Sequence, residues 1–274
     1  MIQLGKIQPL MVVNKTDFGV YLGKEDEKVL LPAKYADPEI EAGDSVTVFV
    51  YRDSMDRLIA TTKEPLITLG QIRTLQVKDV TGIGAFLDWG LEKDLFLPFK
   101  EQTVKVVPGK SYPVALYIDK SNRLCATMKL YHFLSGTDRY KSGDKVRGTA
   151  YEYIDKFGMF VAVDNVFQGL IPKKAFYGRI EIGDEVEAFV SNVTKDGKLE
   201  LDLRAPAYLQ IDVDSDIVLK ALENNKGTLP LNDKSDPERI REELMMSKAA
   251  FKRACGHLLK EGRIVIEESG IRLK

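Results

Sequence analysis

Cysteine, histidine and long apolar runs are scarce in this chain of 274 residues. Its two cysteines, Cys125 and Cys255, lie far apart, which argues against a disulfide-stapled scaffold and against a four-ligand zinc site. No P-loop, nucleophile elbow or glycine-rich dinucleotide motif occurs in the sequence. We therefore expect no enzyme, no metal and no cofactor, although a catalytic group assembled from distant residues stays open.

Apolar runs reach only a few residues, as in Val46–Tyr51, whereas a membrane-spanning helix needs about 20. The first residues, Met1–Lys6, lack the basic and apolar regions of a signal peptide. These two features predict a cytoplasmic protein with no membrane partner. The balance of 40 Lys and Arg against 41 Asp and Glu excludes a strongly basic chain, but it does not exclude local basic patches.

Three internal repeats organise most of the chain. Each repeat has a glycine among apolar residues, then a proline after a short apolar run, then a second glycine before an alternating stretch. These positions are Gly19, Pro32 and Gly43 in the first repeat, Gly84, Pro98 and Gly109 in the second, and Gly158, Pro172 and Gly183 in the third. From one repeat to the next, all three positions move along the chain by nearly the same number of residues, which is unlikely to arise by chance.

Each repeat has the pattern of short β-strands. Small apolar residues occupy every second position over Val46–Tyr51 and again over Val186–Val190, and many of the side chains are β-branched. Gly-Asp pairs precede both stretches, and Asp53–Asp56 and Lys195–Lys198 have the composition of hairpin turns. Several short strands without a long helix predict a small closed barrel, because closure removes exposed strand edges.

The third repeat resembles the S1 RNA-binding domain, a five-stranded barrel of the OB fold. The resemblance rests on Gly143–Gly148, Phe157–Phe160, Gly169–Ile171, Gly183–Val186 and Gly197–Leu201. The first and second repeats resemble divergent members of that family. S1 domains usually carry a histidine where this chain has the repeated proline, so the resemblance implies that one common RNA contact is missing.

The same resemblance indicates basic residues near the last hairpin of each barrel. The aspartate and arginine of the S1 pattern match Asp53 and Arg57 in the first repeat, and Asp119 and Arg123 in the second. In the third repeat Lys198 takes the basic position, and no acidic partner is evident.

Aromatic residues, with one isoleucine, lie around the first glycine of the repeats. The matching pairs are Phe18 and Tyr21, Ile83 and Phe86, and Phe157 and Phe160. Residues three apart on a strand face opposite sides, so some of these rings could fill the barrel; a bulge at the glycine would turn both outward to stack on bases. Lys173 and Lys174 fit either a phosphate contact or a solvated loop. The candidate RNA-binding residues are Phe18, Tyr21, Arg57, Phe86, Arg123, Phe157, Phe160, Lys173, Lys174 and Lys198.

After the third repeat the pattern becomes helical. Asp216 is a candidate N-cap of a first helix, Asp236 of a second, and Ser247 of a third helix that ends at Lys260. The expected apolar face of the third helix carries Phe251, Ala254, Cys255, Leu258 and Leu259. The opposite face carries Lys252, Arg253, Gly256 and Lys260.

A hairpin signal follows, with Ile264–Ile266 and Ile271–Leu273 on either side of a Glu-Ser-Gly turn. Three helices and a hairpin resemble a winged helix, in which the third helix corresponds to the recognition helix. Residues 205–274 have 12 basic and 12 acidic side chains, whereas a strong DNA-binding domain normally has a basic surplus. Two uses therefore stay open for Lys252, Arg253 and Lys260: contact with nucleic acid, including DNA, and docking of a protein.

The whole arrangement resembles the conserved virulence factor B family of bacterial S1-containing regulators. The expected fold is mainly β with a small α+β domain: S1-like OB barrels at residues 1–63, 67–130 and 141–204, and a winged helix at 212–274. The resemblance implies a non-enzymatic protein that binds single-stranded RNA and regulates gene expression after transcription. Two alternatives stay open: a DNA-binding transcription regulator that acts through the winged helix, and an accessory subunit of an RNA-processing enzyme.

Overall fold

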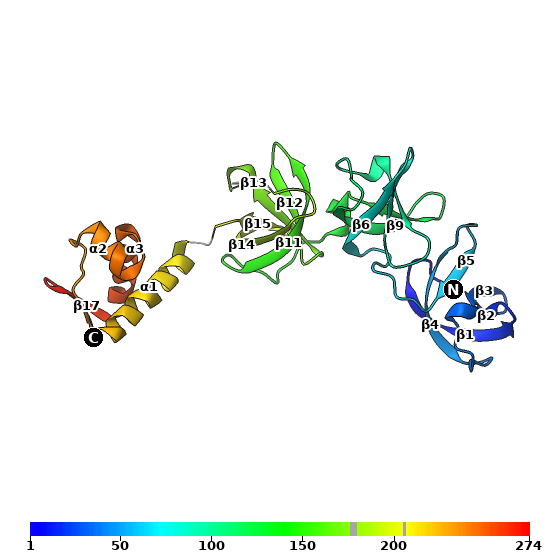
Figure 1. The fold of residues 1–274 in the computed structure, drawn as a ribbon, viewed down its shortest axis with the longest axis horizontal. Coiled ribbons are helices and arrows are strands. Elements are labelled where there is room, and N and C mark those ends of the chain that lie inside the picture. The colour runs from blue at the N-terminus through cyan, green and yellow to red at the C-terminus, as the bar shows by residue number, and fades with distance from the viewer. Residues whose placement is uncertain (176–179, 205–206) are drawn as a thin grey trace. The chain divides into compact units, whose positions relative to one another are not determined.

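The computed structural model describes residues 1–175, 180–204 and 207–274, and only the backbone of residues 207–213. The chain divides into two compact units, Met1–Leu203 and Arg204–Lys274. The first unit contains three closed five-stranded barrels, and the described part of the second contains three α-helices and a small sheet (Figure 1). The predicted fold, mainly β with a small α+β domain, is confirmed.

In each barrel the third strand pairs in parallel with the fifth, and the other neighbouring strands are antiparallel. The first barrel contains β1 (Ile7–Thr16), β2 (Gly19–Lys24), β3 (Glu27–Pro32), β4 (Ser45–Arg52) and β5 (Leu58–Thr61). The second contains β6 (Ile72–Val80), β7 (Gly84–Leu87), β8 (Leu95–Pro98), β9 (Ser111–Ile118) and β10 (Leu124–Thr127). The third contains β11 (Lys145–Ile154), β12 (Gly158–Val163), β13 (Phe167–Pro172), β14 (Glu185–Val193) and β15 (Leu199–Asp202).

The first glycine of each repeat starts the second strand of its barrel. Gly19, Gly84 and Gly158 have φ values of +142°, +157° and +129°, which side chains rarely adopt. A Cβ atom at these positions would lie 2.1, 2.5 and 2.1 Å from a carbonyl oxygen of the facing strand. Each glycine pairs across the sheet with the repeated proline. The repeat therefore encodes one close approach of two strands, which only glycine permits.

The first two barrels share an apolar core. Trp89, the single tryptophan of the chain, is buried in the second barrel. Its ring lies edge-on to Phe49 and Tyr51 of the first barrel, with centroid distances of 5.7 and 6.2 Å. Because large aromatic side chains contribute most to buried area, this cluster fixes the first barrel to the second.

A second apolar cluster joins the second and third barrels. Leu130 and Leu134, around a 3-10 turn at Leu130–Phe133, are buried with Tyr151 and Ala162 of the third barrel. This is the segment that lengthens the spacing between the second and third repeats. The extra residues therefore form a packed connection between barrels.

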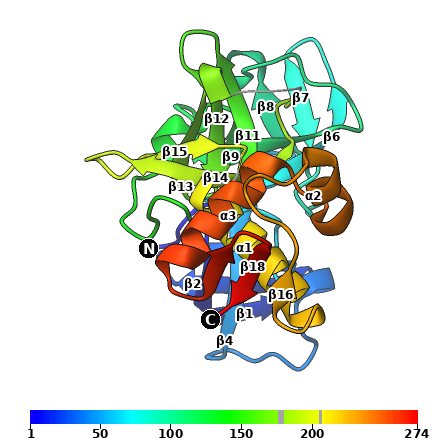
Figure 2. The ribbon, with the colours of Figure 1, turned by 90° about the vertical axis from the view of Figure 1, so that its left-hand side faces the viewer.

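The second unit has the element order of a winged helix. Its elements are α1 (Ala207–Asn224), β16 (Thr228–Leu229), α2 (Pro237–Leu244), α3 (Lys248–Lys260), β17 (Ile264–Glu267) and β18 (Gly270–Leu273). Figure 2 shows α1, α2 and α3 beside the sheet, whose strand order is β16-β18-β17. The predicted N-caps of α2 and α3 are confirmed: Asp236 accepts a hydrogen bond from the Glu238 backbone N–H, and Ser247 from that of Ala250.

Two details of the helical prediction are wrong. The first helix begins at Ala207 instead of at Asp216, because the aspartates before Asp216 belong to the helix, where Asp214 is buried. Leu259 is 47% exposed, although the prediction placed it on the buried face. It follows the buried Leu258 by one residue, and one residue turns a helix by about 100°.

Candidate nucleic-acid interface

The glycine that opens the second strand places two side chains on the outside of each barrel. Phe18, Ile83 and Phe157 precede the strand and are 65%, 68% and 48% exposed. Tyr21, Phe86 and Phe160 lie on the strand and are half-buried. In the third barrel the Phe157 and Phe160 ring centroids are 6.4 Å apart. Both rings therefore avoid the barrel interior, because the first residue of the pair lies before the strand.

Each half-buried residue begins a row that crosses three strands on the side of the sheet away from the barrel core, and of these residues Cys125 is buried. The rows are Tyr21, Leu30 and Ile59 in the first barrel, Phe86, Phe96 and Cys125 in the second, and Phe160, Leu170 and Glu200 in the third. The first two rows are apolar throughout, and the third ends in a carboxylate. The surfaces of the three barrels therefore share one framework and differ in charge.

Lysine side chains lie against rings in the first and third barrels. Lys28 Nζ is 5.3 Å from the Tyr21 ring centroid, and Lys156 Nζ is 5.6 Å from that of Phe157. Both distances fall within the range of about 6 Å for a cation–π contact. A ring beside a lysine offers an apolar surface for a base and a positive charge for its phosphate.

The candidate lysines of the third barrel are close to carboxylates. Lys173 Nζ is 2.7 Å from Asp155, and Lys198 Nζ is 2.7 Å from Asp196, whereas Lys174 is exposed. The hydrogen bond from Lys198 lowers the pKa of Asp196 to about 2. Asp196 is the acidic partner that the sequence comparison missed, because it precedes the lysine by two residues instead of four. These carboxylates offset part of the positive charge available to a phosphate.

In the first barrel the hairpin pair predicted by the S1 resemblance is formed. Arg57 donates from Nε and Nη2 to Asp53 Oδ2, at 3.0 and 2.7 Å. Burial acts to raise the pKa of Asp53, but hydrogen bonds from Arg57 and from the Met55 backbone hold it below its ordinary value. The Arg57 side chain remains 74% exposed, so the pair leaves the guanidinium accessible at the surface.

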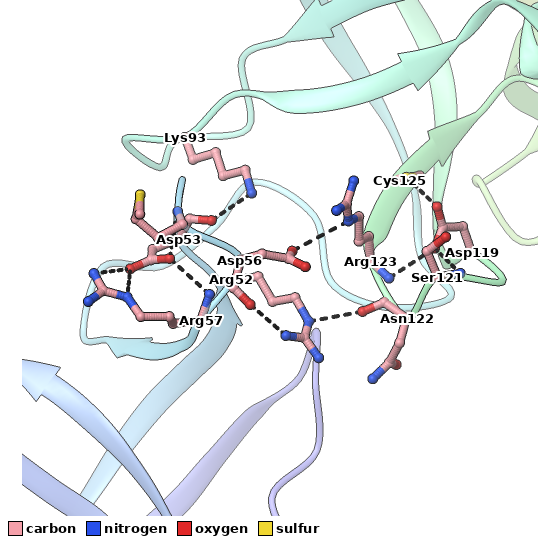
Figure 3. A network of polar contacts seen from close by, with 11 residues as sticks. Arg52, Asp53, Asp56, Arg57, Lys93, Asp119, Ser121, Asn122, Arg123 and Cys125 are labelled. Atoms are coloured by element: carbon pink, nitrogen blue, oxygen red, sulfur yellow. Dashed lines mark hydrogen bonds and ion pairs between the residues drawn. The ribbon is translucent and has the colours of Figure 1, made fainter.

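In the second barrel the equivalent arginine has a different partner (Figure 3). Arg123 Nε lies 3.5 Å from Asp56 of the first barrel, and Asp119 Oδ1 accepts backbone N–H groups of its own turn. Arg52 of the first barrel donates from Nε to the Asn122 carbonyl oxygen at 3.0 Å. The two hairpins therefore bind each other, an arrangement that spacing within one repeat cannot reveal.

On the second unit, Lys252, Arg253 and Lys260 are exposed on α3. Lys252 Nζ lies 3.9 Å from Asp233, and on the wing Arg272 Nε lies 3.0 Å from Glu267. Cations and carboxylates are therefore interspersed on this surface, which agrees with the equal numbers of basic and acidic side chains in residues 205–274.

Two searches of the structure bear on other functions. Within the described ranges, no group of three or more His, Cys, Asp and Glu side chains is placed to hold a metal ion. Among the helices in the described part of the chain, none has the length and apolarity that a bilayer crossing requires.

Comparisons with known proteins agree with this architecture. The S1 domain family matches residues 4–63 and 69–129, and the CvfB-like winged helix domain family matches residues 216–273. The S1 match falls on the two repeats that the sequence pattern presents as divergent.

Relatives match most of the chain. YitL of Bacillus subtilis (strain 168) is 32% identical over 97% of this chain and 92% of its own length. Conserved virulence factor B of Staphylococcus haemolyticus (strain JCSC1435) is 28% identical over 86% of this chain and 81% of its own. A crystal structure of a multidomain protein with nucleic acid binding domains from Streptococcus pneumoniae TIGR4 covers 99% of this chain and 98% of its own, with a TM-score of 0.52 and 24% identity, and so shares the fold. The chain belongs to the conserved virulence factor B family, which joins S1 domains to a C-terminal winged helix.

Proposed function

We propose that the protein binds single-stranded RNA through its barrels and regulates gene expression after transcription. The observation that carries this proposal is the pair of outward side chains repeated beside Gly19, Gly84 and Gly158, with lysines against the rings of the first and third barrels. Stacking of a base on an aromatic ring contributes about 1–3 kcal/mol. It requires an unpaired base, because a duplex covers the faces of its bases.

Three such surfaces on one unit allow weak contacts to add. A strand bound by one barrel is held at high effective concentration near the next barrel, which raises the overall affinity without any new kind of contact. The apolar clusters between successive barrels favour this addition, because they limit independent movement of the barrels. Useful affinity is therefore compatible with a balanced charge.

The proposal is tested by comparing oligouridylate RNA with duplex DNA of equal length at one fixed salt concentration. Fluorescence anisotropy should show tighter binding of the RNA. Phe157→Ala should weaken RNA binding by about 1–3 kcal/mol, and Phe157→Tyr, which keeps a ring, should retain most of it. Tighter binding of duplex DNA would instead favour the winged helix as the principal nucleic-acid-binding surface.

Regulation of gene expression is supported by membership of a family whose relatives carry the name virulence factor B. Crosslinking of the protein to cellular RNA, followed by measurement of the decay of the bound transcripts in a deletion strain, tests this part. Bound transcripts whose levels and decay rates do not change would contradict it.

A further inference from the structure

A hollow of about 510 Å³ lies between the first and second barrels. Its volume is within the range of small-molecule sites, about 300–1,000 Å³. Ile83, Phe86 and Phe96 of the second barrel and Tyr51 of the first barrel line it. The Phe86 and Phe96 ring centroids are 5.4 Å apart and the rings are tilted by 41°. The outward row of the second barrel thus lies in a recess, and the first barrel supplies part of its wall.

Two cations at this hollow are held by neutral acceptors (Figure 3). Arg52 Nη1 donates to the Asp56 carbonyl oxygen at 2.7 Å, and Lys93 Nζ donates to the Asp53 carbonyl oxygen at 2.8 Å. A carbonyl oxygen fixes the position of a cation without cancelling its charge. Arg52 and Lys93 therefore differ from the lysines of the third barrel, which contact carboxylates.

Two of the three carboxylates at the same hollow face a cation. Asp56 lies 3.5 Å from Arg123, and Asp94 lies 2.7 Å from Lys78. Asp119 accepts hydrogen bonds from backbone N–H groups of its own turn, which orient its carboxylate but leave its negative charge. The hollow therefore combines an apolar surface of two rings with two cations, Arg52 and Lys93, that neutral oxygens hold in place, which matches a base with its adjacent phosphate.

We propose that this hollow is a composite nucleotide subsite: one unstacked base of the RNA packs against Phe86 and Phe96, and a neighbouring phosphate binds Arg52 and Lys93. The inference rests on the proposed function and adds a location to it. The apolar surface belongs to the second barrel and Arg52 to the first, so neither barrel forms the subsite alone. The contact between the two hairpins thereby acquires a role in binding.

The protein contains its own reporter for this subsite. Trp89 is the single tryptophan and lines the hollow. Its indole N–H donates to the Lys93 carbonyl oxygen, so movement of Lys93 toward a phosphate changes the surroundings of the indole. Occupancy of the hollow should therefore change tryptophan emission, whereas RNA bound only at other surfaces should not.

The experiment titrates the full-length protein with labelled oligouridylate and records label anisotropy and Trp89 emission in parallel. Both signals should change with the same midpoint. Phe86→Leu, which keeps an apolar side chain, should weaken the emission-detected affinity roughly fivefold or more through the loss of stacking. Lys93→Ala should weaken it as well and reduce the salt slope by about 0.7, the contribution of one phosphate on a single strand. The matched control is Lys105→Ala, an exposed lysine outside the hollow, which should bind as wild type does.

The outcomes separate the two proposals. Anisotropy that reports binding without a change in Trp89 emission, or wild-type affinity in both variants, would overturn the subsite and leave RNA binding by other surfaces standing. Absence of both signals in the wild-type protein would overturn the proposed function and the subsite with it. If Phe86→Leu unfolds, Lys93→Ala decides, because Lys93 is exposed and its loss does not disturb a core.

Discussion

The two units have similar charge balance but different surface chemistry. Residues 204–274 carry 13 basic and 12 acidic side chains, which leaves 27 and 29 for residues 1–203. The barrels expose rings beside lysines, whereas Phe251, the aromatic side chain described in the second unit, is completely buried. Net charge therefore does not distinguish the units. Exposed rings do, and they point to the barrels as the surface that binds unpaired bases.

The largest effect that this comparison predicts is on RNA affinity, from removal of one ring in each of two barrels. Phe18→Ala combined with Phe157→Ala should weaken single-stranded RNA binding by roughly 30-fold or more, because each stacked ring contributes about 1–3 kcal/mol. Anisotropy with a labelled oligoribonucleotide measures the loss. Both side chains are largely exposed, so the free energy of unfolding should change little.

The control for that variant places tyrosine at both positions and should restore most of the affinity. A folded double-alanine variant with wild-type affinity would break the comparison, because it would show that the rings of the barrels do not contact RNA.

A second prediction sharpens the comparison by measuring the stability of each unit separately. Burial raises the pKa of Cys125 to about 11 and that of Cys255 to about 12. Since the thiolate is the reactive form, alkylation at pH 8 should be slower in the native protein by on the order of 100-fold than in the unfolded chain. One cysteine lies in each unit, so mass spectrometry of the two cysteine peptides at increasing urea concentration follows the opening of each unit.

Different midpoints for the two cysteine peptides would show that the units unfold independently. Fast alkylation of either cysteine in the absence of urea would contradict the burial described for that unit.

A smaller effect separates the two rings of the third barrel. Phe160 is half-buried, and its ring lies 6.1 Å from that of Tyr151, at the cluster between the second and third barrels. Phe160→Ala should therefore lower the free energy of unfolding by about 2 kcal/mol, less than the 3–5 kcal/mol for a fully buried phenylalanine. Urea unfolding measures this, with Phe157→Ala as the nearly neutral control. Wild-type stability with strongly weakened RNA binding would instead assign Phe160 to stacking alone.

Much of the fold could be predicted because it depends on local constraints. Gly19, Gly84 and Gly158 are required by a strand approach that no Cβ permits, and this constraint repeats in the sequence with fixed spacing. The caps at Asp236 and Ser247 are equally local, since each side chain bonds a backbone N–H within three residues. The start of α1 was missed because alternating aspartates resemble a loop when their burial is unknown.

The candidate site could be predicted only in part, because some of its contacts cross between repeats. The exposed rings Phe18 and Phe157 follow from the repeat itself. The partner of Arg123 could not be predicted from the repeat, because Asp56 lies in another barrel. The hollow could not be predicted either, because Tyr51, which helps to line it, also lies in another barrel than Phe86 and Phe96. Sequence patterns identify what each barrel carries, but contacts between barrels decide which side chains converge.

The smallest expected effect concerns α3. Replacing Lys252, Arg253 and Lys260 by glutamate should change single-stranded RNA affinity by less than about threefold, because no exposed Phe, Tyr or Trp ring accompanies these cations in the described part of the unit. Salt screens exposed charges over about 8 Å at physiological ionic strength, so the substitutions act only on what contacts α3 directly. Anisotropy at fixed salt measures the change.

A matched control makes this small effect decisive. Lys220, Lys234 and Lys274 are also exposed in the second unit and lie outside α3, so their replacement by glutamate alters the net charge of the protein equally. If both triple variants bind RNA as the wild type does, α3 does not contact RNA. Docking of a protein is then the function to test for Lys252, Arg253 and Lys260. If only the α3 variant loses affinity, by tenfold or more, phosphate contact on the winged helix matters as much as stacking on the barrels. In that case exposed rings would not suffice to rank the two units.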